Sequence, residues 1–303
     1  MKKTVSLSLY PLQDQLGDLG AIEFAAKIGL KAVDFCTDYK RFDYRNPASV
    51  YSKGDRGVTE YFSEIKRLAD KVGVTVCMTH GRGAGFKNVP EEDAALVENA
   101  RLDCLAASTL GAEVCVIHAV TTIFMGPQCP SELMHKLNFD MFSKILPFAR
   151  KYNIKIATET FGDAVKFNSC DFFGNIDEFT QSYNDLCELG GFKDCFKICV
   201  DTGHSNKATR FNNPEPAEVI RKLRSDIVCL HLNDNDKITD QHKIPMTGCI
   251  NWDEVFDALD EIGYSGYYNM ELHLDYFGKQ YVCETAEFAV KMMQSFLERR
   301  YPD

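Results

Sequence analysis

The stretch Lys197-Ile-Cys-Val-Asp201-Thr-Gly-His204 joins a short apolar run to a carboxylate and, three residues later, to a histidine. The apolar run has the length and composition of a buried β-strand. Its polar residues follow at the point where the strand would end. One such run does not define a fold, but the same pattern recurs in both directions along the chain, and the number of repeats decides the architecture.

Eight short apolar runs alternate with longer segments of helical period. The predicted strands are Val5–Tyr10, Ala32–Cys36, Thr75–His80, Val114–Ala119, Lys155–Thr160, Ile198–Asp201, Ile227–Leu232 and Tyr267–Leu272. The predicted helices are Leu19–Ile28, Thr59–Val72, Glu91–Leu110, Phe139–Tyr152, Asp177–Glu188, Pro216–Leu223, Trp252–Ile262 and Val282–Arg299.

The connections between these segments are asymmetric. Those from helix to strand are short and contain glycine, whereas several from strand to helix are long: Thr37–Val58, Gly81–Pro90, Val120–Leu133, Phe161–Ile176 and Asn233–Asn251. A (β/α)₈ barrel has this asymmetry, because its functional loops follow the carboxyl ends of the strands. A doubly wound open sheet is the alternative, but the first strand-to-helix turn lacks a Gly-x-Gly-x-x-Gly nucleotide fingerprint. We therefore expect an α/β protein with a single TIM barrel domain over residues 1–303.

Composition narrows the class of protein. The 303 residues are 45% hydrophobic and 26% charged, with no apolar run long enough to span a membrane and no signal-peptide pattern at the start. The 12 cysteines form no Cys-x-x-Cys pair, and several lie inside apolar runs, as expected of free thiols in a reducing compartment. The net charge of −10 argues against nucleic acid as a partner. We expect a cytoplasmic protein; whether it forms homo-oligomers stays open.

Polar residues end six consecutive predicted strands, from the third to the eighth: His80, His118, Glu159, Asp201, His231 and Glu271. Parallel strands of a barrel end at the same face, so these side chains should form one ring. Buried ionisable groups need partners, and a divalent cation would serve all of them. Oxygen and imidazole ligands without thiolate suit Mn²⁺, Mg²⁺, Co²⁺ or Zn²⁺.

Each residue also has an interpretation without metal. Asp201, Glu159 and Glu271 could cap turns, and His231 could be a hydrogen-bonded core histidine. His80 and His118 are open between metal ligand, substrate contact and core residue.

Several segments together resemble the xylose-isomerase-like TIM barrel superfamily. They are Ile156-Ala-Thr-Glu159, Val200-Asp201-Thr-Gly-His204, Leu230-His231-Leu-Asn-Asp234, the segment from Asp240-Gln-His242 to Trp252, and Gly263-Tyr-Ser-Gly266 leading to Glu271. The superfamily contains sugar phosphate isomerases and epimerases, ketose 3-epimerases, inositol-catabolism enzymes and endonuclease IV. The motifs are specific for the superfamily rather than for one member.

The resemblance to the ketose 3-epimerases implies roles for individual residues. Glu159, Asp201, His231 and Glu271 match the ligands of one divalent metal, which we expect to be Mn²⁺. Glu159 and Glu271 match the residues that remove and return a proton next to a carbonyl, through an enediolate. His204 matches a sugar contact. A Lewis-acidic cation suits this chemistry because it stabilises the developing negative charge.

Two features depart from that branch. The epimerases carry an arginine six residues after the histidine ligand, where this chain has Lys237. The ammonium group of a lysine is a compact charge, whereas the guanidinium of an arginine offers several N–H donors in one plane, so the substrate or its binding mode could differ. Asp240 and His242 resemble extra metal ligands of the endonuclease branch. A trinuclear zinc phosphodiesterase is therefore a rival, although the chain lacks the clustered Lys and Arg of a DNA-backbone binder.

We expect a metal-dependent isomerase or epimerase that acts on a small sugar or polyol derivative. The predicted substrate contacts are His204, His80, His118 and Lys237. The same site and proton abstraction would also serve a lyase or dehydratase on a keto-inositol or keto-glycoside. A barrel that binds a sugar without turnover is the alternative outside enzymes, and the absence of a bindable metal would favour it.

Overall fold

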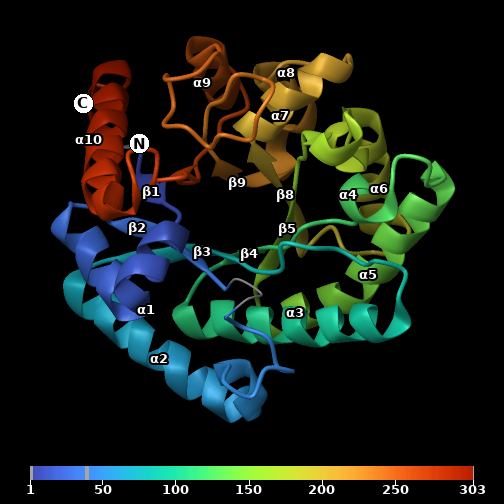
Figure 1. Cartoon of the computed structure of the whole chain (residues 1–303), viewed down its shortest axis with the longest axis horizontal. Helices are drawn as coiled ribbons and strands as arrows, with labels where there is room; N and C mark the ends of the chain where they lie inside the picture. The colour runs from blue at the N-terminus through green and yellow to red at the C-terminus, as the bar shows by residue number, and fades with distance from the viewer. Residues whose placement is uncertain (1–2, 38–40, 303) are drawn as a thin grey trace.

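The computed structural model describes residues 3–37 and 41–302 and contains a ring of eight parallel strands (Figure 1). Six form one sheet in the order β2-β3-β4-β5-β8-β9, and β1 pairs with β10. Single bridges from Ser8 to Asp34 and from Leu232 to Met270 join the two groups. The strands are β1 (Val5–Leu7), β2 (Ala32–Cys36), β3 (Thr75–His80), β4 (Val114–Val116), β5 (Lys155–Glu159), β8 (Phe196–Asp201), β9 (Ile227–His231) and β10 (Tyr268–Met270). The predicted (β/α)₈ barrel is confirmed.

One long helix follows each strand and lies on the outside of the ring (Figure 1). These helices are α1 (Tyr10–Lys27), α2 (Gly54–Val72), α3 (Pro90–Leu110), α5 (Ser131–Tyr152), α6 (Ile176–Glu188), α8 (Pro216–Leu223), α9 (Trp252–Glu261) and α10 (Val282–Arg300). Their apolar faces pack on the strands in one large buried cluster. The sequence predicted all eight, but α1, α2 and α5 begin earlier than expected.

The earlier starts have local causes. The first strand was predicted to extend to Tyr10, but Tyr10 is the first residue of α1. Pro11 lies in the first turn of this helix, where a backbone N–H would have no partner within the helix and its absence is not destabilising. Gly17, at φ 72°, interrupts the helical geometry inside α1, so the periodic segment from Leu19 is only its second part. In α5 the residues from Ser131 form a first stretch that the sequence assigned to a loop.

The long strand-to-helix loops contain structure of their own. After β4 comes α4 (Thr122–Met125), after β5 a hairpin of β6 (Asp163–Ala164) and β7 (Ser169–Cys170), and after β8 the short helix α7 (Thr202–Ala208). Six 3₁₀ turns cover Val50–Lys53, Val165–Phe167, Phe172–Gly174, Thr209–Phe211, Arg224–Asp226 and Lys279–Tyr281. The expected loop Thr37–Val58 includes residues 38–40, which lie outside the described residues. The long loops therefore lie at the carboxyl ends of the strands, as predicted.

A layer of small and apolar side chains fills the barrel below this end. It includes Ala32, Met78, Val116, Ala157, Cys199 and Cys229. Two positions further along the chain from each of them is a polar residue: Asp34, His80, His118, Glu159, Asp201 and His231. Because residues two apart on a strand share a face, the strands carry these polar side chains inward, in the layer above.

Candidate active site

Four side chains from four neighbouring strands meet at the mouth of the barrel. Glu159, Asp201 and His231 are the last residues of β5, β8 and β9, and Glu271 directly follows β10. One ligand atom of each lies within 4.8 Å of those of the others. The Nδ1 atom of His231 is 3.3 Å from a Glu159 oxygen and 3.2 Å from a Glu271 oxygen. The predicted metal ligands are thus brought together.

Asp201 is held in place by its own neighbourhood. Its Oδ1 accepts a hydrogen bond from the backbone N–H of His204 at 2.6 Å, so it caps α7. Its Oδ2 accepts one from the side-chain amide of Asn233 at 2.8 Å. The capping role foreseen as an alternative is therefore real. It is compatible with metal binding, because a carboxylate has lone pairs to spare.

Glu159 and His231 have no such support. Both carboxylate oxygens of Glu159 and both ring nitrogens of His231 are buried, and among the described residues none finds a partner with hydrogen-bond geometry. Unsatisfied buried polar atoms are costly and uncommon in native proteins. A divalent cation between these atoms would satisfy them, and a mixed carboxylate and imidazole set is one that such cations accept. The residues therefore fit a metal ion.

The electrostatics of the cluster depend on mutual charge. Burial would raise the pKa of Glu159, but the charges of His231 and His118 hold it well below its usual value. Burial would lower the pKa of His231, but Glu271 and Glu159 raise it well above its usual value. Burial raises the pKa of Asp201 to about 6.

His80 and His118 lie on the β3 and β4 side of the same cluster. His118 Nε2 is 3.1 Å from Glu159 and 3.2 Å from Nε2 of His80. His80 Nε2 lies 3.5 Å from Glu271. His80 ends β3, but β4 ends at Val116, so His118 follows its strand by two residues instead of lying within it as predicted. Both predicted substrate contacts face the glutamates.

His204, Asp240 and His242 form the opposite side of the cluster. His204 Nδ1 lies 2.9 Å from Glu159, and its Nε2 lies 3.4 Å from Asp240. His242 Nε2 is also 3.4 Å from Asp240. Burial would lower the pKa of His242, but Asp240 and Glu271 raise it to about 9. Ligand atoms of Asp201, His204 and His242 are close enough to share a cation.

These groups open into a cavity of about 450 Å³. His80, His118, Glu159, His204, Asp240, His242 and Glu271 all line it. The ring of Phe161 lies parallel to that of His204, with centroids 5.5 Å apart, and meets His118 edge to face at 4.9 Å. The cavity therefore combines a charged floor with an aromatic wall.

A family model, described as the xylose isomerase-like TIM barrel, matches residues 22–296. The chain belongs to this family. The resemblance that the sequence motifs indicated is confirmed.

Two curated proteins are similar to this chain over part of its length. The chain is 31% identical over 168 residues to an uncharacterised protein of Methanocaldococcus jannaschii, covering 54% of this chain and 52% of that one. It is 24% identical to the inosose isomerase of Halalkalibacterium halodurans, covering 76% and 73%. The chain spans about half the length of the first of these relatives.

A solved structure shows the same fold over the whole chain. The IOLI protein with a bound zinc atom superposes with a TM-score of 0.70 at 19% identity, covering 99% of each chain. At this identity the likeness concerns the fold. Of the three proteins named, one is described as an isomerase, the inosose isomerase.

One predicted substrate contact lies elsewhere. Lys237 follows β9 by six residues, but its Nζ lies 2.8 Å from Glu215, and Lys237 is not among the described residues that line the cavity. The lysine of the cavity wall is Lys207, on α7. It is 2% exposed, and its Nζ lies 2.8 Å from Asp163 and 3.5 Å from Asp240.

Sequence reasoning missed three members of the site. Lys207 and Asp163 lie in segments expected to be loops, with no periodic pattern to orient them. Asp34 lies inside β2 rather than at its end, so it did not stand out. The sequence feature that could have identified Asp34 is its spacing of two residues from Ala32. This spacing places both side chains on the face of β2 that points into the barrel, as for the other polar residues.

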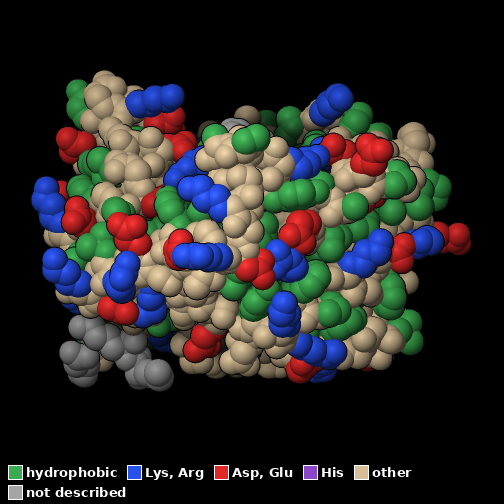
Figure 2. All heavy atoms as spheres, turned by 90° about the horizontal axis from the view of Figure 1, so that it is seen from below, with side chains coloured by type: hydrophobic (Ala, Val, Ile, Leu, Met, Phe, Trp, Pro, Cys, Tyr) green, Lys and Arg blue, Asp and Glu red, His purple; other side chains and the backbone are tan. Residues whose placement is uncertain are grey.

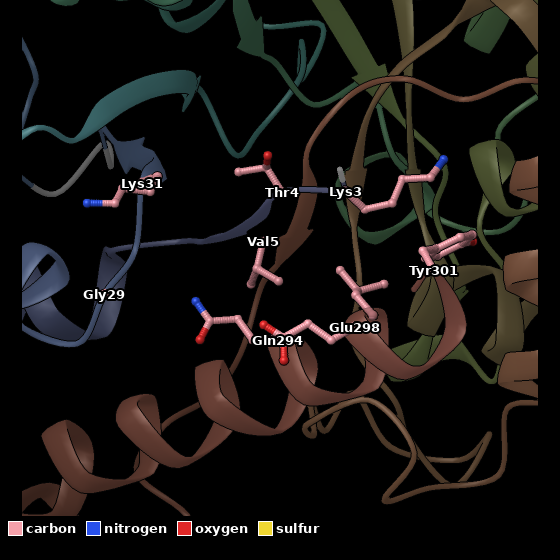
Figure 3. Close-up of a pocket in the computed structure, with 9 residues that line it drawn as sticks. Lys3, Thr4, Val5, Gly29, Lys31, Gln294, Glu298 and Tyr301 are labelled. Atoms are coloured by element: carbon pink, nitrogen blue, oxygen red, sulfur yellow. The ribbon is translucent and has the colours of Figure 1, made fainter. Parts of the chain in front are cut away.

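A second cavity, of about 540 Å³, lies at the opposite end of the barrel (Figure 3). It is lined by residues that precede β1 and β2 and by the last turns of α10, among them Lys3, Lys31 and Glu298. None of the predicted site residues lines it. In barrels of this kind the amino-terminal end serves stability rather than chemistry.

On the face shown in Figure 2, basic and acidic side chains are intermixed, and the Lys and Arg side chains form no continuous stripe. None of the twelve cysteines, all of which lie in the described residues, forms a disulfide. Within residues 3–37 and 41–302, no helix combines the length and apolar character needed to cross a membrane.

Proposed function

We propose that the protein is a divalent-metal-dependent isomerase or epimerase of a sugar or polyol derivative. The observation that carries this proposal is the cluster of Glu159, Asp201, His231 and Glu271, whose ligand atoms lie within 4.8 Å of one another, and whose two glutamates line a cavity of about 450 Å³. The inosose isomerase among the relatives supports the same class of reaction.

The four clustered residues would hold one metal ion, which we propose is Mn²⁺, with Mg²⁺, Co²⁺ or Zn²⁺ as alternatives. When bound, the ion supplies Lewis acidity that stabilises negative charge next to a carbonyl. Asp201 is fixed by its hydrogen bonds to His204 and Asn233 and contributes charge. His231 contributes a ring nitrogen between the two glutamates.

Glu159 and Glu271 would transfer the proton. Both are held below their usual pKa by the neighbouring imidazoles, so both are carboxylates at neutral pH and able to accept a proton. They lie on β5 and after β10, with His80 within 3.7 Å of Glu159 and 3.5 Å of Glu271. One glutamate would remove the proton next to the carbonyl, and the other would return one.

Hydrogen-bonding groups on the cavity wall support a sugar substrate. His80, His118 and His204 line it with Phe161, so imidazoles would contact the hydroxyl groups and the phenyl ring would cover a carbon face of the substrate.

The test combines metal analysis with isotope exchange. The purified chain is loaded with Mn²⁺, its metal content is measured, and a panel of free ketoses, keto-inositols and keto-glycosides is followed in deuterated water by NMR. We expect about one metal per chain and exchange of one carbon-bound proton with the carbon skeleton retained.

Other outcomes identify the alternatives. Exchange accompanied by loss of water or of an alcohol would assign the lyase. Three zinc ions per chain and cleavage of abasic DNA would assign the phosphodiesterase. A protein that binds no divalent metal and exchanges no substrate would contradict the proposal and favour a binding barrel.

A further inference from the structure

The wall of the cavity contains a buried lysine between two carboxylates. Lys207 lies on α7, one turn after His204, and is 2% exposed. Asp163 comes from β6, in the loop after β5, and Asp240 comes from the loop after β9. Their oxygens lie 2.8 Å and 3.5 Å from Nζ of Lys207. We call these three residues the lysine clamp.

The backbone is built to bring the clamp together. A Cβ atom on Gly162 would lie 2.9 Å from the carbonyl oxygen of His204 and 3.1 Å from Cβ of Lys207. Glycine at this position therefore lets the loop that carries Asp163 lie directly against α7. Arg210 reaches Asp163 from the outer side, at 3.3 Å.

The clamp determines which charges the cavity presents to a ligand. Among the described residues that line it, Lys207 is the one lysine, no arginine is present, and the carboxylates are Glu159, Asp163, Asp240 and Glu271. His204 and His242 both face Asp240, at 3.4 Å each. The positive groups of this wall are thus already neutralised by carboxylates.

A phosphate group needs the opposite arrangement. Proteins bind it with unpaired Lys or Arg, or with free backbone N–H groups at the start of a helix. Here the start of α7 is capped by Asp201. A phosphate near Lys207 would face the carboxylates of Asp163 and Asp240. Negative charges at such distances repel each other strongly where bulk water does not screen them.

An uncharged hydroxyl meets no such repulsion. An ammonium group has three N–H donors, and Lys207, whose contacts with Asp163 and Asp240 are ion pairs, can direct one of them to the ligand. We propose that Lys207 is the cationic substrate contact of this site, and that the clamp selects uncharged sugars over sugar phosphates. This inference rests on the proposed function, because it concerns the substrate of the same cavity.

The experiment compares matched pairs of substrates, D-fructose with fructose 6-phosphate and D-ribulose with ribulose 5-phosphate. Exchange kinetics are measured on the Mn²⁺-loaded full chain and on the variants Lys207→Met, Asp163→Asn and Lys222→Met. Lys222 lies on α8, where it pairs with Asp177 outside the cavity, and is the matched control.

We expect kcat/KM to be at least about tenfold higher for the free sugar of each pair. Lys207→Met should raise KM for the free sugar by about tenfold to hundredfold, because a hydrogen bond to a charged donor is lost. Asp163→Asn should lower the discrimination against the phosphate, which a merely structural role of Asp163 would not do. Lys222→Met should leave all constants unchanged.

Equal or better use of the phosphorylated sugars, or an unchanged KM in Lys207→Met, would overturn the inference while leaving the proposed function intact. Calorimetric binding of the same compounds gives a readout without turnover. If no compound exchanges a proton, the proposed function fails. In that case the calorimetric data decide the inference. Tighter binding of the free sugars than of the sugar phosphates, lost in Lys207→Met, would support it, and tighter binding of the sugar phosphates would overturn it.

Discussion

The Nε2 atom of His231 lies 4.0 Å from Oδ2 of Asp34, deep in the barrel. The other ring nitrogen, Nδ1, faces Glu159 and Glu271. Neither oxygen of Asp34 has a hydrogen-bond partner within the part of the chain that the structure describes. A histidine that binds metal through one nitrogen usually donates the other N–H to a carboxylate, which fixes its tautomer and orientation. At 4.0 Å the two groups are not hydrogen-bonded, and we propose that the carboxylate of Asp34 orients His231 through its charge.

Asp34→Asn should therefore weaken Mn²⁺ binding by about tenfold to hundredfold. The neutral amide lacks the negative charge that stabilises the partly positive ring of a metal-bound histidine. Calorimetric titration of the metal-free protein measures this directly, without relying on activity. Asp253→Asn, on the exposed start of α9, is the control. Unchanged affinity in Asp34→Asn would show that His231 is oriented by packing alone.

Glu159→Gln and Glu271→Gln should each lower the rate of proton exchange by at least about a hundredfold, because an amide cannot accept the proton. Each glutamate lies at the rim of the barrel, above the packed layer that includes Ala157 and Cys199. The thermal midpoint should therefore shift little. NMR exchange and calorimetric scanning of the same samples separate the two effects, and full activity in either variant would refute its assigned role.

Gly162→Ala should lower the free energy of unfolding by about 1 to 3 kcal/mol, since the new methyl group meets the backbone of α7. It should also raise KM, because the loop that carries Asp163 must move. Gly83→Ala is the matched change for stability: its Cβ would meet His118 only at 3.9 Å, an ordinary contact. Equal stability losses in the two variants, measured by urea unfolding, would contradict the close approach at Gly162.

Asp171 gives a pH-dependent prediction outside the ligand cluster. It accepts hydrogen bonds from the backbone N–H groups of Phe173 and Thr122, yet burial raises its pKa to about 6. Because the folded pKa exceeds the unfolded value of about 3.8, the stabilising contribution of this group is greatest at low pH and is lost as the pH rises to about 6. The loss is at most about 3 kcal/mol, from about 1.4 kcal/mol for each tenfold change in proton affinity.

The measurement is urea unfolding of wild type and Asp171→Asn in EDTA, at pH 4.5 to 7. Asparagine does not titrate, so the advantage of the wild type over the variant should shrink as the pH rises. A difference that is constant with pH would mean that the Asp171 carboxyl titrates normally.

The sequence predicted the barrel and the four clustered residues because both depend on local signals. Each residue of the cluster follows a run of apolar residues, and parallel strands of alternating α/β segments end at the same face. Asp201 ends its strand as the predicted range has it, Glu159 and His231 end theirs one residue before the predicted ranges do, and Glu271 follows its strand by one.

The rest of the wall depends on contacts between distant loops. Lys237 was chosen by its spacing from His231, yet the positive φ of Lys237 and its pairing with Glu215 take it out of the cavity. Lys207 enters instead because α7, a helix of seven residues, turns it toward Asp163. No periodic pattern in the sequence predicts that the loop of Asp163 lies against α7. The one local feature that permits this contact is Gly162, which has no side chain to collide with α7.

The closing of the ring also bears on how the chain folds as it is made. Val5 pairs with Tyr268, so the first strand of the barrel must wait for nearly the whole chain before its partner exists. During synthesis the six strands from β2 to β9 can assemble earlier, as a curled sheet with two open edges, and they already carry Glu159, Asp201 and His231. Glu271 arrives with the strand that seals the ring. The fourth residue of the cluster therefore joins the other three only when the barrel closes, and an incomplete chain cannot bring all four together.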